Sequence, residues 1–329
     1  MTLLDETQKF PKLSRLYENT SLDFNCIISI GMIKRTLMFS NPAYLSHSNG
    51  QLVISFPEKV KGNKTVPIED IGVLVMENQQ ITISHGCIAA LLQNNVAIVS
   101  CDVSHMPVGL VLPLDGGNTQ AERFRYQIEA SLPLKKQLWQ QTIQQKIYNQ
   151  ARVLETIGVD AVNMHRWSKS VKSGDPDNYE GRAAAYYWQN IFSQYISFNR
   201  NKAGEPPNNL LNYGYAILRA IVARSLVSSG LLPTLGIFHR NKYNAYCLAD
   251  DIMEPYRPFV DLIVYDIVME GLTIHELDIS LKMRLLQLPQ VDVQFDDITS
   301  PLLVGISRTT ASLARCFEGV SRKINYPSI

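Results

Sequence analysis

The chain has 329 residues and a mass of 37.1 kDa, a length typical of two domains. Its hydrophobic fraction of 46% is too high for a disordered protein, and 31 basic against 30 acidic residues exclude the strongly basic balance of many nucleic-acid-binding domains. Five cysteines, with no CxxC spacing, argue against a disulfide framework or zinc knuckle and favour reduced thiols in the cytoplasm. Neither a targeting peptide nor a membrane span of ~18 apolar residues is expected.

The first part of the chain, residues 1–115, contains short runs rich in Val, Ile and Phe, which are typical of β-strands. Asn49-Gly50 lies between two such runs and predicts a hairpin. Residues 85–94 have the apolar spacing of a short helix. We therefore predict a small sandwich or a pair of sheets in this part. Since no glycine-rich phosphate-binding motif follows any of these runs, a nucleotide-binding parallel sheet is not expected.

Residues 116–120, with paired glycines at their start, are predicted to link two domains. The apolar spacing over residues 121–329 is that of helices, and Gly158 and Gly230 are placed as helix ends. The expected fold class is therefore α+β, with a β-strand-rich domain followed by an all-helical domain. Residues 1–118 hold 8 basic and 10 acidic residues against 23 and 20 in the remainder, so nucleic-acid contacts are expected in the helical half.

Glu180 is the first polar residue in the helical half that looks out of place. Asp177 or Asn178 predicts a helix N-cap, which puts Glu180 in the first turn and in line with Tyr187 on a core-facing stripe. An inward carboxylate needs a cation, a hydrogen-bond network or a metal. The alternative is that Glu180 simply stabilises the helix N-terminus through the macrodipole.

His239 is the second, because it directly follows an apolar Gly-Ile-Phe run. A structural histidine is the commoner role in such a place, although histidine is also a frequent metal ligand. Arg240 and Lys242, beside it, suit phosphate better than a hydrophobic core.

The segment ADDIMEPYRPFVD is the third. Asp251 and Glu254 share a face if it is helical, and Pro255 predicts a helix start or a kink there. The alternative is an N-cap cluster balanced by Arg257. Four carboxylates stand around that arginine: Asp250, Asp251, Glu254 and Asp261.

Together these three places describe a candidate site for a hard divalent metal. Carboxylates with one imidazole suit Mg²⁺ or Mn²⁺. Such a metal beside basic residues fits phosphodiester chemistry, and the spacing could equally serve the hydrolysis of another ester.

Four motifs carry a family resemblance: YEGRAAAYYW, PPNNLLNYGYAIL, GIFHRNKYN and DDIMEPYRPFVD, with fifteen residues from His239 to Glu254. With VPIEDIGVLVMEN and NVAIVSCD ahead of them, the chain resembles the universal CRISPR-associated endonucleases, the spacer-acquisition integrases, over nearly its whole length. LWQQTIQQKIYNQARVL resembles their type II branch. The resemblance implies an N-terminal domain that mediates dimerisation and a C-terminal helical catalytic domain.

The resemblance also implies the site. Glu180, His239 and Glu254 would be catalytic residues and ligands of Mg²⁺ or Mn²⁺, with Asp251 as a candidate fourth ligand. The implied reaction joins the 3′-hydroxyl of a short foreign DNA to a phosphodiester of the CRISPR repeat by strand transfer. The implied partners are double-stranded DNA, a second copy of the chain, a small adaptation subunit (Cas two) and, in type II, accessory subunits.

Basic and aromatic residues near these motifs are candidates for DNA contact. For the basic ones the alternative is ion pairing with neighbouring acids, foremost for Arg257; for the tyrosines, which could stack on bases, a core position is the commoner one. The basic candidates are Arg182, Arg240, Lys242 and Arg257, and the tyrosines are Tyr186, Tyr187, Tyr213 and Tyr215.

Two other functions stay open. A non-catalytic DNA-binding scaffold of the same assembly would keep the fold and work through its partners, although it has no need of three convergent ligands. A hydrolase of small phosphoesters would need a closed pocket. The near-zero net charge agrees with DNA bound across an assembly, with each chain contributing a patch.

Overall fold

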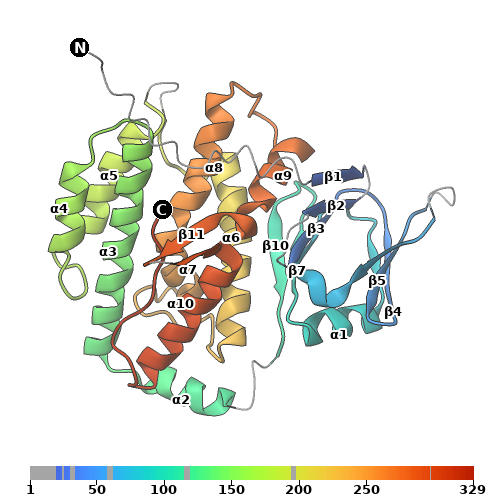
Figure 1. The fold of residues 1–329 in the computed structure, drawn as a ribbon, viewed down its shortest axis with the longest axis horizontal. Coiled ribbons are helices and arrows are strands. Elements are labelled where there is room, and N and C mark those ends of the chain that lie inside the picture. The colour runs from blue at the N-terminus through green and yellow to red at the C-terminus, as the bar shows by residue number, and fades with distance from the viewer. Residues whose placement is uncertain are drawn as a thin grey trace.

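The structure is a computed structural model of the chain, and it has an α+β fold in which a strand-rich half lies beside a helical half (Figure 1). This is the fold class predicted from the sequence. The predicted linker falls mostly outside the described residues, and the first helix of the second half begins at Gln120. The structure describes residues 20–23, 26–29, 34–57, 62–114, 119–193, 198–296 and 298–329, with side chains from Lys34 onward.

Two sheets build the strand-rich half. The larger has the order β1-β2-β3-β7-β9-β10, in which β3, β7 and β9 are parallel and the outer pairs are antiparallel. The smaller has the order β6-β5-β4-β8, in which β4 and β8 are parallel. The elements are β1 (Thr20–Asp23), β2 (Cys26–Ser29), β3 (Arg35–Phe39), β4 (Tyr44–Ser48), β5 (Gln51–Ser55), β6 (Lys64–Pro67), η3 (Ile68–Asp70), β7 (Ile71–Met76), β8 (Thr82–Ile83), α1 (His85–Gln93), β9 (Ala97–Cys101) and β10 (Pro107–Val111).

The turn and the short helix predicted in this half are confirmed. Asn49 and Gly50 both have positive φ, 49° and 73°, as a two-residue hairpin requires, and they join β4 to β5. Helix α1 starts at the N-cap Ser84, whose side chain accepts a hydrogen bond from the N–H of Cys87. Paired sheets are also observed, and their parallel central strands are a feature that the sequence did not predict.

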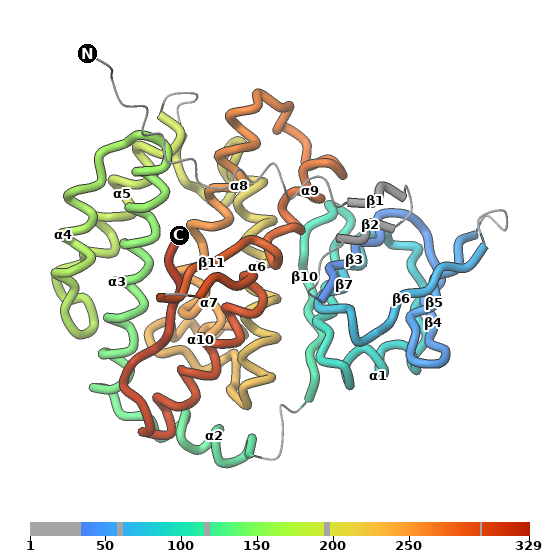
Figure 2. Tube along the Cα trace, in the orientation of Figure 1, coloured from blue at the N-terminus to red at the C-terminus, as the bar shows by residue number. Residues whose placement is uncertain are grey.

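The central strands of the larger sheet are buried on both faces. Leu37 and Leu74 belong to the core between the two sheets and α1, whereas Met38 and Val75 belong to the core of the helical half. Successive side chains of a strand point to opposite faces, so the apolar run in β7 serves both cores. Helix α6 lies beside β9 and β10, where the two halves meet (Figure 2).

In the stretches 119–193, 198–296 and 298–329, the second half is helical apart from the hairpin β11–β12, which the sequence did not predict. Gly158 and Gly230, with φ of 80° and 70°, follow the ends of α3 and α6 as predicted. The elements are α2 (Gln120–Glu129), α3 (Leu132–Thr156), α4 (Val162–Ser170), α5 (Tyr179–Asn190), α6 (Asn208–Ser228), α7 (Cys247–Met253), η4 (Glu254–Tyr256), α8 (Arg257–Met269), α9 (Ile279–Leu286), η5 (Leu288–Gln290), β11 (Asp292–Phe295), β12 (Ile298–Pro301) and α10 (Leu302–Phe317).

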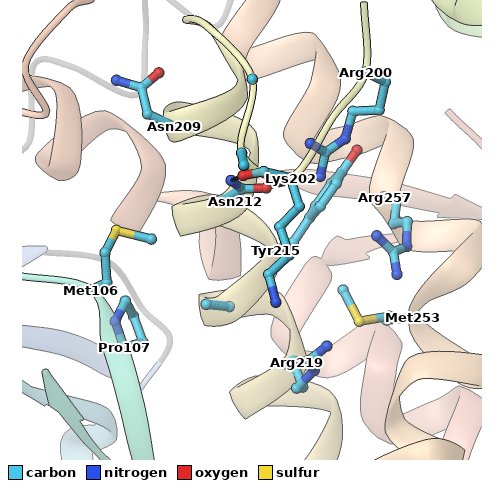
Figure 3. Close-up of a pocket in the computed structure, with 13 residues that line it drawn as sticks. Met106, Pro107, Arg200, Lys202, Asn209, Asn212, Tyr215, Arg219, Met253 and Arg257 are labelled. Atoms are coloured by element: carbon cyan, nitrogen blue, oxygen red, sulfur yellow. Dashed lines mark hydrogen bonds between the residues drawn. The ribbon is translucent and has the colours of Figure 1, made fainter. Parts of the chain in front are cut away.

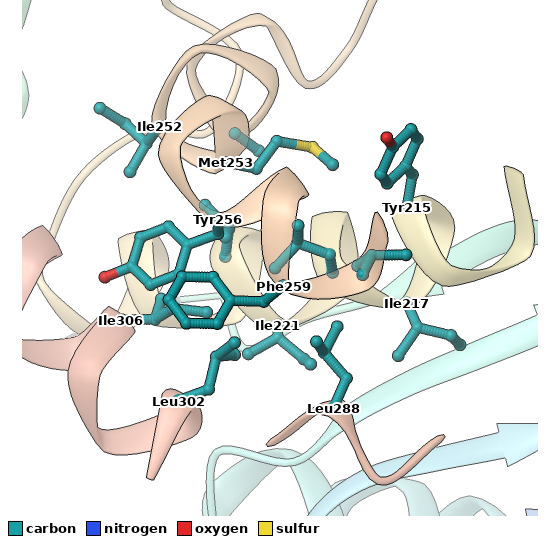
Figure 4. Packing of buried hydrophobic residues seen from close by; sticks show 14 of the residues in the cluster. Tyr215, Ile217, Ile221, Ile252, Met253, Tyr256, Phe259, Leu288, Leu302 and Ile306 are labelled. Atoms are coloured by element: carbon teal, nitrogen blue, oxygen red, sulfur yellow. The ribbon is translucent and has the colours of Figure 1, made fainter. Parts of the chain in front are cut away.

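Helix α6 is the centre of this half. Its Ile217 and Ile221 pack with Tyr256 of η4 and Phe259 of α8 (Figure 4). Gly214 allows α8 to approach closely, because a Cβ there would lie 2.4 Å from Val260 Cγ1. Of the helices that the structure describes, α6 is the one long and apolar enough to cross a membrane, but 78% of that window is buried inside the protein, as in a core helix.

Candidate functional site

Three separate elements bring two carboxylates to one lysine. The Nζ atom of Lys146, on α3, lies 2.7 Å from Glu180 Oε1 at the start of α5 and 2.6 Å from Glu254 Oε2 at the start of η4. The side chains of Glu254 and Lys146 are 7% and 11% exposed, and that of Glu180 is 25% exposed. We refer to Lys146, Glu180 and Glu254 as the carboxylate cluster.

The start of α5 positions Glu180. Asn178 is the N-cap, as predicted, and its side chain accepts a hydrogen bond from the N–H of Gly181. Asp175 accepts from the N–H groups of Tyr179 and Glu180, each at 2.9 Å. These side chains satisfy the free amides of the first turn, so the backbone that carries Glu180 is fixed.

The turn between α7 and α8 positions Glu254. Glu254 keeps helical angles, and the change of geometry predicted at Pro255 takes the form of the 3₁₀ turn η4. Asn149, one turn after Lys146 on α3, donates a hydrogen bond of 2.7 Å to the carbonyl of Pro255. Helix α3 therefore supplies both the cation for Glu254 and the anchor for its backbone.

Asp251 orients His239. Its Oδ1 lies 2.5 Å from His239 Nδ1, and its Oδ2 accepts from the N–H groups of Ile237 and Phe238 at 2.7 and 2.9 Å. The hydrogen bond to Asp251 raises the pKa of His239 and leaves Nε2 as the free ring nitrogen. Asp251 is fully buried, and both of its oxygens take part in the hydrogen bonds that hold His239. Its role as a candidate fourth metal ligand stays a prediction.

Neighbouring opposite charges keep Glu254 and Lys146 ionised. Burial on its own raises the pKa of Glu254, but the Arg257 guanidinium and the Lys146 ammonium outweigh it and hold that pKa at about 2. Burial likewise lowers the pKa of Lys146, and Glu254 and Glu180 reverse the shift so that the pKa is raised. Glu254 and Lys146 are therefore both charged at neutral pH. Glu254 and Glu180 also contribute to the raised pKa of His239, so the three predicted residues are in electrostatic contact.

The donor types fit a hard divalent cation, although the side chains do not form a ready-made metal cage. Among the described residues, no three acidic, histidine or cysteine side chains are grouped closely enough to hold a metal ion as they stand. The physical reason is the ammonium of Lys146 between the two carboxylates. Glu254 Oε2 is nevertheless buried without a well-directed hydrogen bond, although Lys146 Nζ is close to it. Such an oxygen suits a cation, and Glu180, Glu254 and His239 Nε2 would be the residues that hold it.

Two of the other predicted carboxylates lie outside the cluster. Asp250 pairs with Arg219 at 2.6 Å. Asp261 is buried and accepts hydrogen bonds from the hydroxyls of Tyr187 and Tyr215. Burial raises the pKa of Asp261 to about 7, against the two tyrosine hydrogen bonds, which lower it. These two tyrosines are therefore core residues that hold an acid.

A basic cleft of about 720 Å³ opens beside the cluster, between β10 of the first half and α6, α7 and α8 of the second (Figure 3). Arg257 joins the two, because its Nε lies 2.9 Å from Glu254 Oε1 while its side chain lines the cleft. Sequence analysis missed the other three cations of this cleft. The cationic lining is Arg200, Lys202, Arg219 and Arg257.

The other predicted phosphate contacts lie outside this cleft. Arg182 and Lys242 are exposed and stand over the rings of Tyr179 and Tyr243. Arg240 is exposed and lines a second cavity beside His239. Their role in DNA binding stays a prediction.

Comparison with known proteins identifies the family to which this chain belongs. The family model described as CRISPR associated protein Cas1 matches residues 37–279. The CRISPR-associated endonuclease Cas1 of Neisseria meningitidis serogroup C (strain 8013) is 37% identical over 301 residues, 91% of this chain and 97% of that protein. The CRISPR-associated endonuclease Cas1 1 of Pyrobaculum aerophilum is 30% identical over 237 residues, 67% of this chain and 77% of that protein. The chain belongs to the Cas1 family, and the resemblance seen in its motifs is confirmed.

Solved structures share the fold at lower identity. A casposase bound to an integration product has a TM-score of 0.72 at 20% identity, covering 87% of this chain and 90% of that one. A Cas1 protein from Thermotoga maritima has a TM-score of 0.68 at 17% identity, covering 86% and 97%. Both halves of the chain are therefore arranged as in known members of the fold.

Proposed function

We propose that this chain is the divalent-metal-dependent DNA endonuclease and integrase of CRISPR adaptation, which joins the 3′-hydroxyl ends of short foreign DNA to the CRISPR repeat by strand transfer. One observation carries the proposal: Glu180 and Glu254 meet at Lys146 from separate elements, an Asp251-oriented His239 is in electrostatic contact with both, and Arg257 links Glu254 to a basic cleft. The names of the relatives support it, since two of the most similar are CRISPR-associated endonucleases and a casposase with this fold is bound to an integration product.

Strand transfer is an in-line displacement at phosphorus, in which positioning and charge stabilisation dominate. Glu180, Glu254 and His239 Nε2 would hold Mg²⁺ or Mn²⁺, which when bound polarises the phosphodiester and neutralises developing charge. Asp251 fixes the tautomer and orientation of His239, so that Nε2 stays available. Arg257 reaches Glu254 from the cleft side, where it can contact a phosphate of the bound strand. Lys146 holds the two carboxylates together and, with Arg257, keeps Glu254 ionised.

The proposed partners follow from the cleft and from the family. DNA would enter the basic cleft, whose lining includes no acidic side chain among the described residues. A Cas6-RT-Cas1–Cas2 complex with a TM-score of 0.69 and a TtCas1–DNA complex with a TM-score of 0.55 share the fold, which supports a small Cas2 subunit and DNA as partners. The proposal also includes a homodimer formed through the strand-rich half, type II accessory subunits and a cytoplasmic location.

A strand-transfer assay tests the proposed function. The full chain, with and without the small partner subunit, is mixed with a short duplex bearing free 3′-hydroxyls and a supercoiled plasmid carrying a repeat. Label is expected in relaxed plasmid with Mg²⁺ or Mn²⁺, and not in chelator, nor with His239→Ala or Glu180→Ala. His165→Ala is the matched control, because His165 pairs with Glu155 at 2.6 Å on the surface and its loss should leave the product unchanged. Absence of product from the complete wild-type mixture, while DNA still binds, would contradict the proposal.

A second candidate is the non-catalytic scaffold, and the position of Lys146 favours it. A lysine ammonium already serves as the counter-ion of both carboxylates, which is sufficient for a structural role. Calorimetric titration with Mn²⁺ separates the two functions. An integrase should show a site that His239→Ala removes, and a scaffold should show none.

A further inference from the structure

An exposed, rigid aromatic ring stands next to His239. Phe238 is 46% exposed, although phenylalanine side chains are usually buried in a protein core. Its ring is stacked on that of Trp139, with centroids 4.2 Å apart and planes 1° from parallel. Trp139 is only 1% exposed, so Phe238 rests on a fixed base and presents its other face outward.

The ring borders a cavity of about 400 Å³ that differs from the basic cleft in its lining. Leu132, Trp139 and Ile237 make its apolar wall, and Lys136 and Arg240 are its cations. Both cations are exposed, and neither has a carboxylate within ion-pair distance in the part of the chain that the structure describes. The stem of Lys136 packs over Gly174, where a Cβ would lie 3.2 Å from Lys136 Cγ.

This combination of groups fits a nucleotide better than a peptide. A flat aromatic face offers a stacking surface that any nucleobase can use, and two unpaired cations beside it suit the flanking phosphates. An apolar peptide segment would leave both cations without partners. The edge-on contact of the Phe238 and His239 rings, with centroids 5.5 Å apart, puts this surface next to the proposed reaction centre.

We propose that Phe238, backed by Trp139, is a stacking platform for an unpaired nucleobase of the DNA strand whose phosphodiester is held at Glu180, Glu254 and His239, with Lys136 and Arg240 contacting the flanking phosphates. The proposal rests on the proposed function and adds a site to it. It requires the DNA near the reaction centre to be single-stranded, because a paired base has no free face to offer. Phe238 is then a binding residue, and its loss acts on the strand end and not on the metal ligands.

Fluorescence of 2-aminopurine tests the platform directly. The full chain is titrated, in chelator, into a duplex with a short 3′ single-stranded end that carries 2-aminopurine. The wild-type chain should quench the fluorophore, since stacking on an aromatic ring quenches it. Phe238→Ala and Phe238→Leu should lose the quenching and bind this DNA about 5- to 150-fold more weakly, the range expected for one stacked base. Phe238→Trp should restore both.

Two controls separate stacking from a structural effect. Leu235→Ala removes a side chain of similar exposure, 39%, from the same segment and should change neither readout. A blunt duplex should bind wild type and Phe238→Ala equally. The proposed platform would be contradicted if Phe238→Ala weakened the binding of blunt and single-stranded ends equally, or if this variant still quenched the fluorophore. The strand-transfer assay gives an independent result. If Phe238→Ala loses the quenching but the wild-type chain shows no strand transfer, the proposed function is contradicted and the stacking platform is supported.

Discussion

Within the described residues, two largely buried lysines contact carboxylates, and their surroundings differ in solvent access. Lys282, on α9, pairs with Glu77, which directly follows β7, and the two side chains are 5% and 2% exposed. Lys146 pairs with Glu180 and Glu254 in a cluster that reaches solvent, because Glu180 is 25% exposed. The first contact is almost fully buried between the two halves, with His105 and a cavity of about 500 Å³ at its edge, whereas the second opens beside a basic cleft.

The difference indicates what distinguishes a purely structural ion pair from a functional site. The Lys282–Glu77 pair joins α9 to the strand-rich half, and both of its side chains are almost fully buried. In the carboxylate cluster, one face of the ion pairs stays accessible, and His239, with a side chain 43% exposed, stands next to it. Burial of a lysine therefore carries little information about function, and access to its carboxylate partners carries more.

Breaking the Lys282–Glu77 pair should have the largest effect on stability. Lys282→Met leaves the Glu77 carboxylate buried without its lysine, which typically costs about 3–5 kcal/mol of the free energy of unfolding. Urea denaturation measures this loss. The double variant Lys282→Met with Glu77→Gln should recover much of it, since no charge is then buried alone. If the single variant unfolds like the wild type, His105, whose Nδ1 lies 3.2 Å from Glu77 Oε1, is sufficient as a partner.

Lys146→Met should have a smaller effect on stability and one that metal reverses. Glu254 keeps Arg257 as a partner and Glu180 can reach water, so the expected loss is about 1–3 kcal/mol. Without the competing ammonium, Mn²⁺ should raise the melting temperature of this variant by more than that of the wild type, because a ligand that binds the folded state stabilises it. Differential scanning fluorimetry with and without Mn²⁺ measures both effects.

A surface lysine provides the matched control for this experiment. Lys172 pairs with Asp177 at 3.3 Å, and the side chains are 74% and 43% exposed. Lys172→Met should change stability by less than about 0.5 kcal/mol and should leave the response to Mn²⁺ unchanged. A Lys146→Met variant with no added response to Mn²⁺ would count against metal binding at the cluster and in favour of the scaffold.

Sequence analysis predicted best what depends on neighbouring residues. The hairpin at Asn49-Gly50 and the cap at Asn178 are local, because each depends on one turn of backbone. Pro255 predicted the break in helix geometry for the same reason, since a proline constrains the residue before it. The residue types first suggested that the places of Glu180, His239 and Glu254 form one metal site, and the family resemblance then implied these three residues as its ligands; that assignment stays a prediction.

The remainder of the site depends on tertiary contacts that no local pattern carries. Lys146 meets carboxylates 34 and 108 positions later in the chain. A signal existed, because Lys146 lies directly before the buried Ile147 and three residues after the buried Ile143, on or near the buried face of α3. The basic cleft was missed because Arg200 and Lys202 stand in a loop whose position is set by α6, where Arg200 donates to Asn208 and Asn212.

Asp261, seven residues after Glu254, is a further buried acid that can be compared with Glu254. It is 1% exposed, and in the described part of the chain its hydrogen-bond donors are two tyrosine hydroxyls and no cation. Cations hold the pKa of Glu254 at about 2, whereas burial raises the pKa of Asp261 to about 7. In mildly acidic solution Glu254 is therefore ionised and Asp261 is protonated, because their partners differ.

The raised pKa of Asp261 predicts a pH dependence of stability with a definite sign. The folded protein holds this proton up to about pH 7, and the unfolded chain releases it near 3.8, so the stabilisation is complete below that lower value and is lost as the pH rises through about 7. The difference in unfolding free energy between wild type and Asp261→Asn should therefore fall by up to about 1.4 kcal/mol per pH unit between these limits. Urea denaturation at pH 5, 6, 7 and 8 measures it, with Asp177→Asn, an exposed acid, as the variant whose difference should stay flat. A flat difference for Asp261→Asn would mean that the two hydroxyls, with Arg257 and Arg200 at longer range, stabilise the ionised carboxylate as well as water does.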